Sequence, residues 1–390
     1  MAGIFKFLKG DKVVWILVMV MTLVSILVVF SSISSLAFRS HSLMYHFIKH
    51  TVLLVVGLGI VFGTHLVPYK YFSKLSIGLF YISIPLLIIT LFLGQNLNSA
   101  NRSLLFMGLS FQTSDLAKIA LIMFVARMLS RAQDNNEVRD FKNFVLPLGA
   151  KIFLICGLIL PADLSTAALL FCTSICLLFI GRVKILHVVN LIVLGVLTLA
   201  VAMILLSQVT DKVRISTWKA RVERYIDKDA GKSVTDKDFQ STQSKVAVAT
   251  GGIFGKGPGH SSQRNILPHP YSDFIYAIII EEYGLPGAII VLLIYLILFY
   301  RAGVIVRRSP THFGAFLAIG LSMSLVFQGL INMGVCVGVL PVTGQPLPFV
   351  SMGGTSIVFT SIAIGAILSV SRSCQSQKKT EPVLAFDTKD

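Results

Sequence analysis

The sequence predicts an all-α polytopic membrane protein with about ten transmembrane helices, and three observations support this fold class. Hydrophobic residues make up 55% of the 390-residue chain and charged residues only 13%, about half the charged share of an average soluble domain. Ten stretches approach the roughly 20 apolar residues that a transmembrane helix needs. Lys and Arg gather between alternate stretches. This composition argues against a soluble enzyme, a nucleic-acid-binding protein and a disordered chain, because so few polar side chains cannot cover a soluble globule of this size.

The ten apolar stretches follow one another with short connections and one long one. We interpret the first as an uncleaved span, because its uncharged run 13–30 exceeds the roughly 7–15 residues of a signal-peptide core. Only Pro161, Ala162 and Asp163 separate the fifth stretch from the sixth, which predicts a tight hairpin at one membrane face. The stretches are 13–34, 46–67, 75–95, 114–130, 144–160, 164–181, 185–207, 273–300, 311–338 and 350–371.

The distribution of Lys and Arg predicts the orientation. With the N-terminus inside, the inner segments carry 18 of these residues, whereas the short outer segments carry only Arg39, Lys49 and Arg102. Basic short loops stay cytoplasmic, so we expect both termini in the cytoplasm. The net charge of +16 then reflects orientation and anionic head groups rather than nucleic acid. The chain divides into a ten-span membrane domain, 1–372, and a disordered cytoplasmic tail, 373–390.

Residues 208–272 form one large extracytoplasmic loop between the seventh and eighth stretches. Within it we expect an amphipathic helix on the membrane surface at 211–229. A polar, mobile segment follows at 230–245, and a glycine-rich turn region at 251–259 leads back toward the bilayer.

Ionisable side chains in or at the edge of spans are costly, so each is a candidate for function. Asp273, at the outer start of the eighth stretch, either caps a helix or is a general base for a hydroxyl of an anionic substrate. Asp163 has the same two interpretations, capping or function, at the sixth stretch. Lys118, one turn inside the fourth stretch, either pairs with Asp115, extends outward to water, or binds an anion.

Three loop cations are further candidates. Arg102 lies in an otherwise uncharged outer loop, and Lys256 and Arg264 flank the glycine-rich region; each either neutralises a phosphate or is simply solvated. Glu281 and Glu282, about two turns below Asp273, are interpreted as a structural hydrogen-bonding pair. His and Cys show no metal-ligand spacing, so no residue is assigned to a metal.

The segment 340–356 cannot begin as regular helix, because three prolines interrupt it. Irregular backbone at membrane depth survives where it lines a cavity. Ser351, Thr355 and Ser356 would supply hydroxyls to a lipid head group there, or the glycines of the segment would serve tight helix packing. The residues leave both interpretations open.

Several of these segments together match one family. They are 161–167 (Pro-Ala-Asp-Leu-Ser-Thr-Ala), 243–244 (Gln-Ser), 251–257 (Gly-Gly-Ile-Phe-Gly-Lys-Gly), 267–277, 281–284 (Glu-Glu-Tyr-Gly), 332–334 (Asn-Met-Gly) and 351–356 (Ser-Met-Gly-Gly-Thr-Ser). Over residues 10–372 the chain resembles the SEDS proteins (shape, elongation, division and sporulation), bacterial membrane glycosyltransferases that polymerise peptidoglycan from lipid II. Residues 10–12 and 341–346 resemble the cell-division (FtsW-type) branch more closely than the elongation (RodA-type) branch.

The resemblance implies that Asp273 is catalytic, because it takes the place of the essential aspartate in the family's Thr-Asp-Phe motif, with Ser272 for the threonine. Asp163 begins the counterpart of the family's Asp-Leu-Gly-Thr, with Ser165 for the glycine. Lys118 is the lysine of Pro-Ser-Glu-x-x-Lys, with an aspartate in place of the glutamate. Arg102 takes the place of a loop arginine, but Ser-Leu follows it instead of Trp-Ile.

The implied reaction transfers a growing glycan from undecaprenyl pyrophosphate to the 4-hydroxyl of the lipid II acceptor sugar. Asp273 would act as general base. Lys118, Arg102, Lys256 and Arg264 would offset the charge of the leaving pyrophosphate, a role that a divalent cation such as Mg²⁺ or Mn²⁺ could share.

The implied setting is the bacterial inner membrane at the division septum. The implied partners are lipid II, a class B penicillin-binding protein (a transpeptidase), other division proteins and membrane lipids. Two rival functions remain, a lipid II flippase and a non-catalytic division scaffold. Transporters usually place ionisable residues near the midplane, whereas Asp273 lies at the outer edge, which favours surface chemistry. Lys151 and the Glu281/Glu282 pair, which lie within spans, leave the transporter interpretation open.

Overall fold

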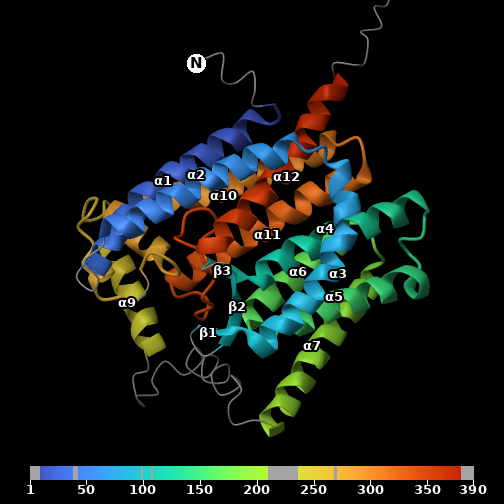
Figure 1. The fold of residues 1–390 in the computed structure, drawn as a ribbon, viewed down its shortest axis with the longest axis horizontal. Helices are drawn as coiled ribbons and strands as arrows, with labels where there is room; N and C mark the ends of the chain where they lie inside the picture. Colours follow the sequence, from blue (N-terminus) through green and yellow to red (C-terminus); the bar gives the residue numbers. More distant parts are fainter. Residues whose placement is uncertain are drawn as a thin grey trace, which may run out of the picture.

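The computed structural model describes residues 9–37, 43–97, 100–106, 109–209, 236–267 and 270–378. A helix occupies each of the ten apolar stretches (Figure 1). This is expected, because only internally hydrogen-bonded backbone is stable in lipid. These helices are α1 (Lys12–Ala37), α2 (Leu43–Leu66), α3 (Lys70–Leu93), α4 (Thr113–Asp134), α5 (Leu146–Ile159), α6 (Leu164–Ile180), α7 (Ile185–Val209), α10 (Ile275–Arg308), α11 (His312–Cys336) and α12 (Gly354–Lys378).

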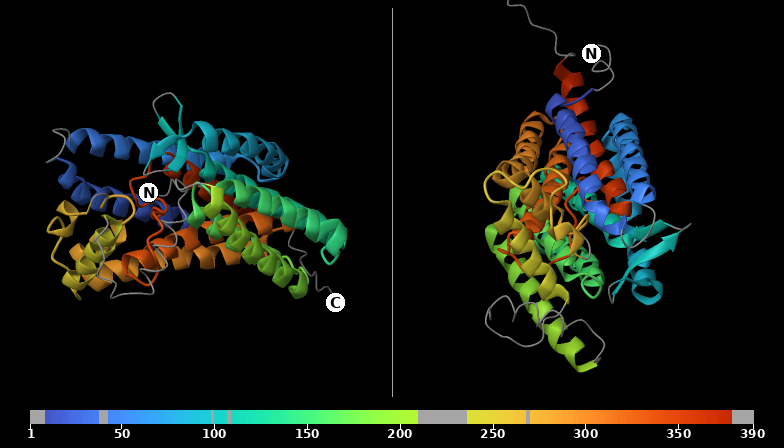
Figure 2. Two further views of the ribbon diagram at one scale, coloured as in Figure 1. Left: turned by 90° about the horizontal axis from the view of Figure 1, so that it is seen from below. Right: turned by 90° about the vertical axis from the view of Figure 1, so that its left-hand side faces the viewer.

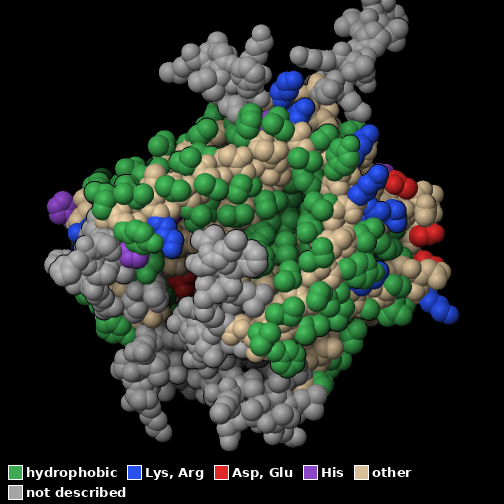
Figure 3. Space-filling view, viewed as in Figure 1, with side chains coloured by type: hydrophobic (Ala, Val, Ile, Leu, Met, Phe, Trp, Pro, Cys, Tyr) green, Lys and Arg blue, Asp and Glu red, His purple; other side chains and the backbone are tan. Residues whose placement is uncertain are grey.

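The all-α polytopic membrane fold is therefore confirmed. Within the described ranges, seven helices are long and apolar enough to cross a membrane, namely α1, α2, α3, α5, α10, α11 and α12. α6 and the described apolar part of α7 are shorter, and α4 carries five charged residues, so the count of ten spans stays a prediction. Hydrophobic side chains are spread over the coloured part of the face in Figure 3, and most visible Lys and Arg lie toward the end where α12 ends.

Helix α11 lies at the centre of the bundle, packed against α4, α6, α10 and α12 (Figures 1 and 2). The predicted hairpin after α5 is present, because α6 begins at Leu164 with Asp163 as its N-cap. The segment after α11 is irregular until Gly354, as its prolines predict. Two short helical turns complete the helices, a π-helical turn at Phe141–Val145 before α5 and a 3₁₀ turn at Gln263–Asn265.

Three strands between α3 and α4 were not predicted. β1 (Gln95–Leu97), β2 (Ala100–Phe106) and β3 (Leu109–Gln112) form an antiparallel sheet in the order β1-β2-β3, which projects from one edge of the bundle (Figure 2). β1 and β3 are only three and four residues long, and strands this short carry little periodic signal.

Two boundaries differ from the prediction. Helix α9 (Asp236–Gly251) occupies much of the segment expected to be mobile, because Ser244 and Ala247 are buried against the bundle and Ser244 Oγ donates to the carbonyl of Cys336 at 2.8 Å. Helix α12 continues past the predicted boundary at 372, because Gln375 exchanges hydrogen bonds with the backbone of Gly10. The expected surface helix at 211–229 and most of the tail lie outside the described residues.

Candidate active site

Asp273 stands one residue before the N-cap position of α10, which is Phe274. Its side chain is half-buried, and Ser272 Oγ donates to Asp273 Oδ1 at 2.8 Å. The carboxylate thus lies outside the first turn of the helix and accepts a hydrogen bond from its neighbour. This position favours the functional interpretation of Asp273 over capping.

The backbone around Asp273 is fastened to α11 and to the segment between α11 and α12. Asn332 Nδ2 donates to the carbonyl of Asp273 at 2.8 Å, and Ser351 Oγ donates to the carbonyl of Ser272 at 2.6 Å. Met352 N donates to the carbonyl of Tyr271 at 2.9 Å. Of the three predicted hydroxyl residues, Ser351 therefore lies beside the catalytic candidate.

Asp163 does cap α6, since its Oδ1 accepts a hydrogen bond from Thr166 N at 3.2 Å. The capping interpretation is confirmed, but it uses one oxygen. The other, Oδ2, accepts from Gln345 Nε2 at 3.3 Å, and the side chain is 3% exposed. Asp163 is thereby linked to the same α11–α12 segment that holds Asp273.

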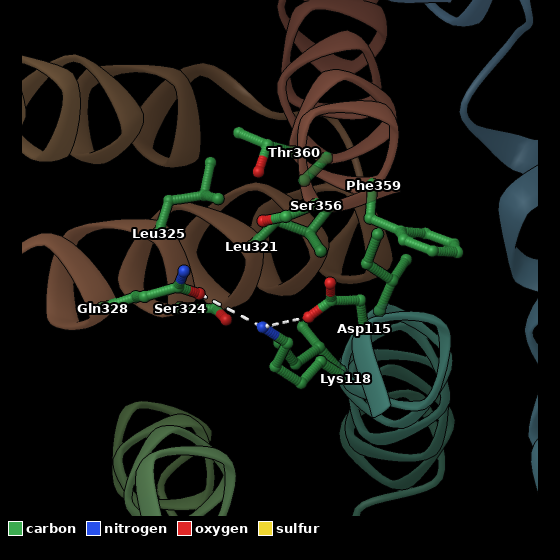
Figure 4. A pocket seen from close by; sticks show the side chains of 12 residues that line it. Asp115, Lys118, Leu321, Ser324, Leu325, Gln328, Ser356, Phe359 and Thr360 are labelled. Atoms are coloured by element: carbon green, nitrogen blue, oxygen red, sulfur yellow. Dashed lines mark hydrogen bonds and ion pairs between the residues drawn. The ribbon is translucent and has the colours of Figure 1, made fainter. Parts of the chain in front are cut away.

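Lys118 is paired inside the bundle. Its Nζ lies 2.8 Å from Asp115 Oδ1 and donates to Gln328 Oε1 at 3.1 Å. Figure 4 shows this group around a cavity of about 30 Å³ between α4, α11 and α12. The cavity exceeds the roughly 10–15 Å³ that one water needs, and it is far smaller than a sugar or a pyrophosphate.

The other two predicted hydroxyls lie on the Lys118 side of the site. Ser356 lines the same cavity as Lys118, and Thr355 Oγ1 accepts from Gln112 N at 3.2 Å. Arg102 belongs to β2, and its side chain lies outside the described residues.

Lys256 and Arg264 belong to a different cluster. Lys256 Nζ lies 2.6 Å from Glu281 Oε1 and donates to Ser262 Oγ at 2.9 Å, while Arg264 Nη1 donates to the carbonyl of Ser31 at 3.2 Å. Glu281 is fully buried and also accepts from Ser261 Oγ and the backbone N–H groups of residues 262 and 263.

The glutamate pair has the predicted structural role. Glu282 accepts from Ser31 Oγ, and the backbone near both glutamates is open because α10 breaks at Gly284, whose φ is 66°. The glycine-rich turn fills the break: Lys256 N and Gly257 N each donate at 2.9 Å to the carbonyls of Glu281 and Glu282. We conclude that Lys256 holds the loop on α10, whereas Arg264 holds it on α1.

Three amides that the sequence analysis did not single out connect the site. Gln328 and Asn332 lie one turn apart on α11, and Gln345 lies between α11 and α12; all three are buried. The candidates predicted from the sequence were ionisable side chains and the hydroxyls of segment 340–356, but no amides. Polar amides in an apolar helix at a spacing of four would have been a signal, because burying them without partners is costly.

Metal ligands are sparse in the described part of the chain. No group of three or more His, Cys, Asp and Glu there is arranged to hold a metal ion. Mg²⁺ is commonly held by one or two carboxylates together with substrate phosphates, so Asp273 or Asp163 fits a cation only if the substrate supplies the remaining oxygens.

Comparison with known proteins gives matches over nearly the whole chain. A family model described as "Cell cycle protein", which covers FtsW, RodA and SpoVE, matches residues 11–376. The chain is 31% identical over 383 residues to the probable peptidoglycan glycosyltransferase FtsW of Aliivibrio salmonicida, covering 97% of this chain and 92% of the relative. It is 32% identical over 368 residues to stage V sporulation protein E of Bacillus subtilis, covering 93% and 97%.

A solved structure has the same fold. One chain of a peptidoglycan synthase complex, determined for the coordination of polymerization and crosslinking, superposes with a TM-score of 0.72 at 24% identity, covering 94% of this chain and 98% of that one. The protein therefore belongs to the FtsW/RodA/SpoVE family of cell cycle proteins, the same family that its motifs resemble.

Proposed function

We propose that this protein polymerises peptidoglycan glycan strands from lipid II at the outer face of the bacterial inner membrane. The family and the names of its relatives support this activity. The observation that carries the proposal is Asp273, a half-buried carboxylate outside the cap of α10 whose backbone is held by Asn332 and Ser351.

In the proposed reaction, Asp273 takes the proton of the 4-hydroxyl of the acceptor sugar. The hydroxyl oxygen forms a bond to C1 of the growing strand while the C1–pyrophosphate bond breaks, which inverts that carbon. Undecaprenyl pyrophosphate leaves with the electron pair. We assign Arg102 to the charge of the leaving group; Lys118, which is paired with Asp115 beside a cavity far smaller than a pyrophosphate, is not assigned to it. Ser351, Thr355 and Ser356 are candidates for head-group contacts. Lys256 and Arg264, which hold the loop, are left out.

The prenyl chain requires an apolar surface near the chemistry. A cavity of about 480 Å³ lies between α5, α6 and α7, and its lining includes Leu160, Pro161 and Leu164 beside the hairpin that carries Asp163. Pockets of roughly 300–1,000 Å³ hold ligands of ordinary size. We assign this cavity to part of an undecaprenyl tail.

We further propose a septal location, cytoplasmic termini and a class B penicillin-binding protein as partner, alongside other division proteins. The orientation is supported by the basic residues near the end of α12 (Figure 3). A partner is supported by the solved relative, which is part of a peptidoglycan synthase complex.

The test is synthesis by purified protein. We expect the protein in detergent or nanodiscs, alone or with its transpeptidase partner, to convert labelled lipid II into long strands on a gel. Transfer of labelled lipid II across vesicle membranes without any polymer would support the flippase instead. If the protein makes no polymer and transfers no lipid II while cells still divide normally, the scaffold function remains.

Lys256→Met is expected to lower thermal stability and leave polymerisation per folded molecule unchanged. Breaking a fully buried ion pair costs about 3–5 kcal/mol. Here Lys256 is 31% exposed and Glu281 keeps its other donors, so we expect about 1–3 kcal/mol. The melting temperature and the turnover of the purified variant check this. If the melting temperature is unchanged but turnover is lost, Lys256 belongs to the substrate site.

A further inference from the structure

Gln345 links Asp163 to the backbone of Asp273 through hydrogen bonds. Its Nε2 donates to Thr166 Oγ1 at 2.7 Å and to Asp163 Oδ2 at 3.3 Å. The side chain is 4% exposed. An amide nitrogen carries two hydrogens, so both donors of Gln345 are used on the first turn of α6.

The backbone of Gln345 reaches the other aspartate through Asn332. Asn332 Nδ2 donates at 2.8 Å to the carbonyl of Gln345 and at 2.8 Å to the carbonyl of Asp273. One nitrogen thus holds both carbonyl oxygens, and it also uses both of its hydrogens. A continuous path of hydrogen bonds runs from Asp163 through Gln345 and Asn332 to the backbone of Asp273.

The segment that carries Gln345 is held rigidly. Phe349 has a φ of 64°, a conformation that a bulky residue keeps only where its surroundings hold it. Tyr295 OH donates to the carbonyl of Pro348 at 2.5 Å, and Ser25 Oγ donates to the carbonyl of Val350 at 2.8 Å. Contacts from α1 and α10 therefore fix a loop whose two ends contact Asp163 and Ser272.

We propose that Gln345 is a positioning residue for the reaction, and that Asp163 acts by fixing Gln345 rather than by touching substrate. Asp163, which caps α6, holds the Gln345 amide. Gln345 and Asn332 then set the position of the Asp273 backbone, and with it the direction of the carboxylate. A catalytic group displaced by about 1 Å loses about 10²-fold in rate. This inference rests on the proposed general-base role of Asp273.

The experiment is a set of kinetic cycles with lipid II as substrate. Gln345→Met keeps the side-chain length and removes both donors; we expect kcat to fall about 10–100-fold with little change in KM. In the double variant with Asp163→Asn the losses should not multiply, because both changes break one path. In an Asp273→Asn background, Gln345→Met should not lower the residual rate further.

Folding is controlled separately. Ser322→Ala, which removes a buried hydroxyl that donates to the carbonyl of Ile319 within α11, should lower stability slightly and leave kcat intact. If Gln345→Met does not fold, Thr166→Val removes the 2.7 Å acceptor of Gln345 while keeping the Thr166 N–H that Asp163 caps. This variant should lower kcat less but in the same direction.

The possible failures are distinguishable. A wild type that makes no polymer contradicts the proposed function. A wild type that polymerises, with losses at Gln345 and Asp163 that multiply, contradicts the positioning path. A rise in KM at constant kcat in Gln345→Met would make Gln345 a substrate contact and also overturn the proposal.

Discussion

Asp273→Asn is expected to lower the rate of lipid II polymerisation by about 10²–10⁴-fold, the usual contribution of a general base. The asparagine keeps the size of the side chain and can still accept from Ser272 Oγ, so the fold around α10 should survive. What is lost is the basic oxygen that takes the proton of the acceptor hydroxyl. The measurement is strand formation from labelled lipid II by equal amounts of monodisperse protein.

The matched control is Asp140→Asn. Asp140 is a partly exposed aspartate that caps the turn before α5, accepting from Lys142 N at 3.0 Å and Asn143 N at 3.2 Å. Asparagine caps as well as aspartate, so this variant should polymerise like the wild type. Equal product from Asp273→Asn and Asp140→Asn would remove Asp273 from the mechanism.

Gly255→Ala is expected to have the largest effect on stability. A Cβ at this position would lie 2.3 Å from the carbonyl oxygen of Glu282, and the residue has a φ of +76°. The left-handed backbone costs an alanine about 1–2 kcal/mol, and forcing apart two backbone segments adds about 1–3 kcal/mol. The glycine-rich turn should therefore leave the break in α10, and little folded protein should be recovered.

Gly252→Ala separates the two causes. Gly252 also has a positive φ, +54°, but a Cβ there meets nothing within 4 Å, so only the backbone cost applies. Melting curves of the two variants in the same detergent compare them directly. If Gly255→Ala and Gly252→Ala have the same melting temperature, the turn does not pack into the break of α10.

The candidate site combines features that local sequence reveals with features that it hides. Asp273 and Asp163 are visible because an acid at the edge of an apolar stretch is rare and costly. The partner of Lys256 was not predictable, because Glu281 lies 25 residues away on another element. The sequence analysis weighed pairing with Asp115 for Lys118, and the structure confirms it, because three residues along a helix bring two side chains together.

The sequence by itself determined the membrane class, the ten helical segments, the hairpin at Asp163 and the irregular segment before α12. Each of these follows from a local property: apolar length, the conformational limits of proline, or an acid before an apolar run. Only the tertiary structure decided that Asn332 bonds both Gln345 and Asp273, and that Gln345 bonds Thr166. Those residues come together because α6, α10 and α11 pack side by side. Hydropathy along one chain ranks residues by their preference for lipid or water, but it does not record which buried face meets which.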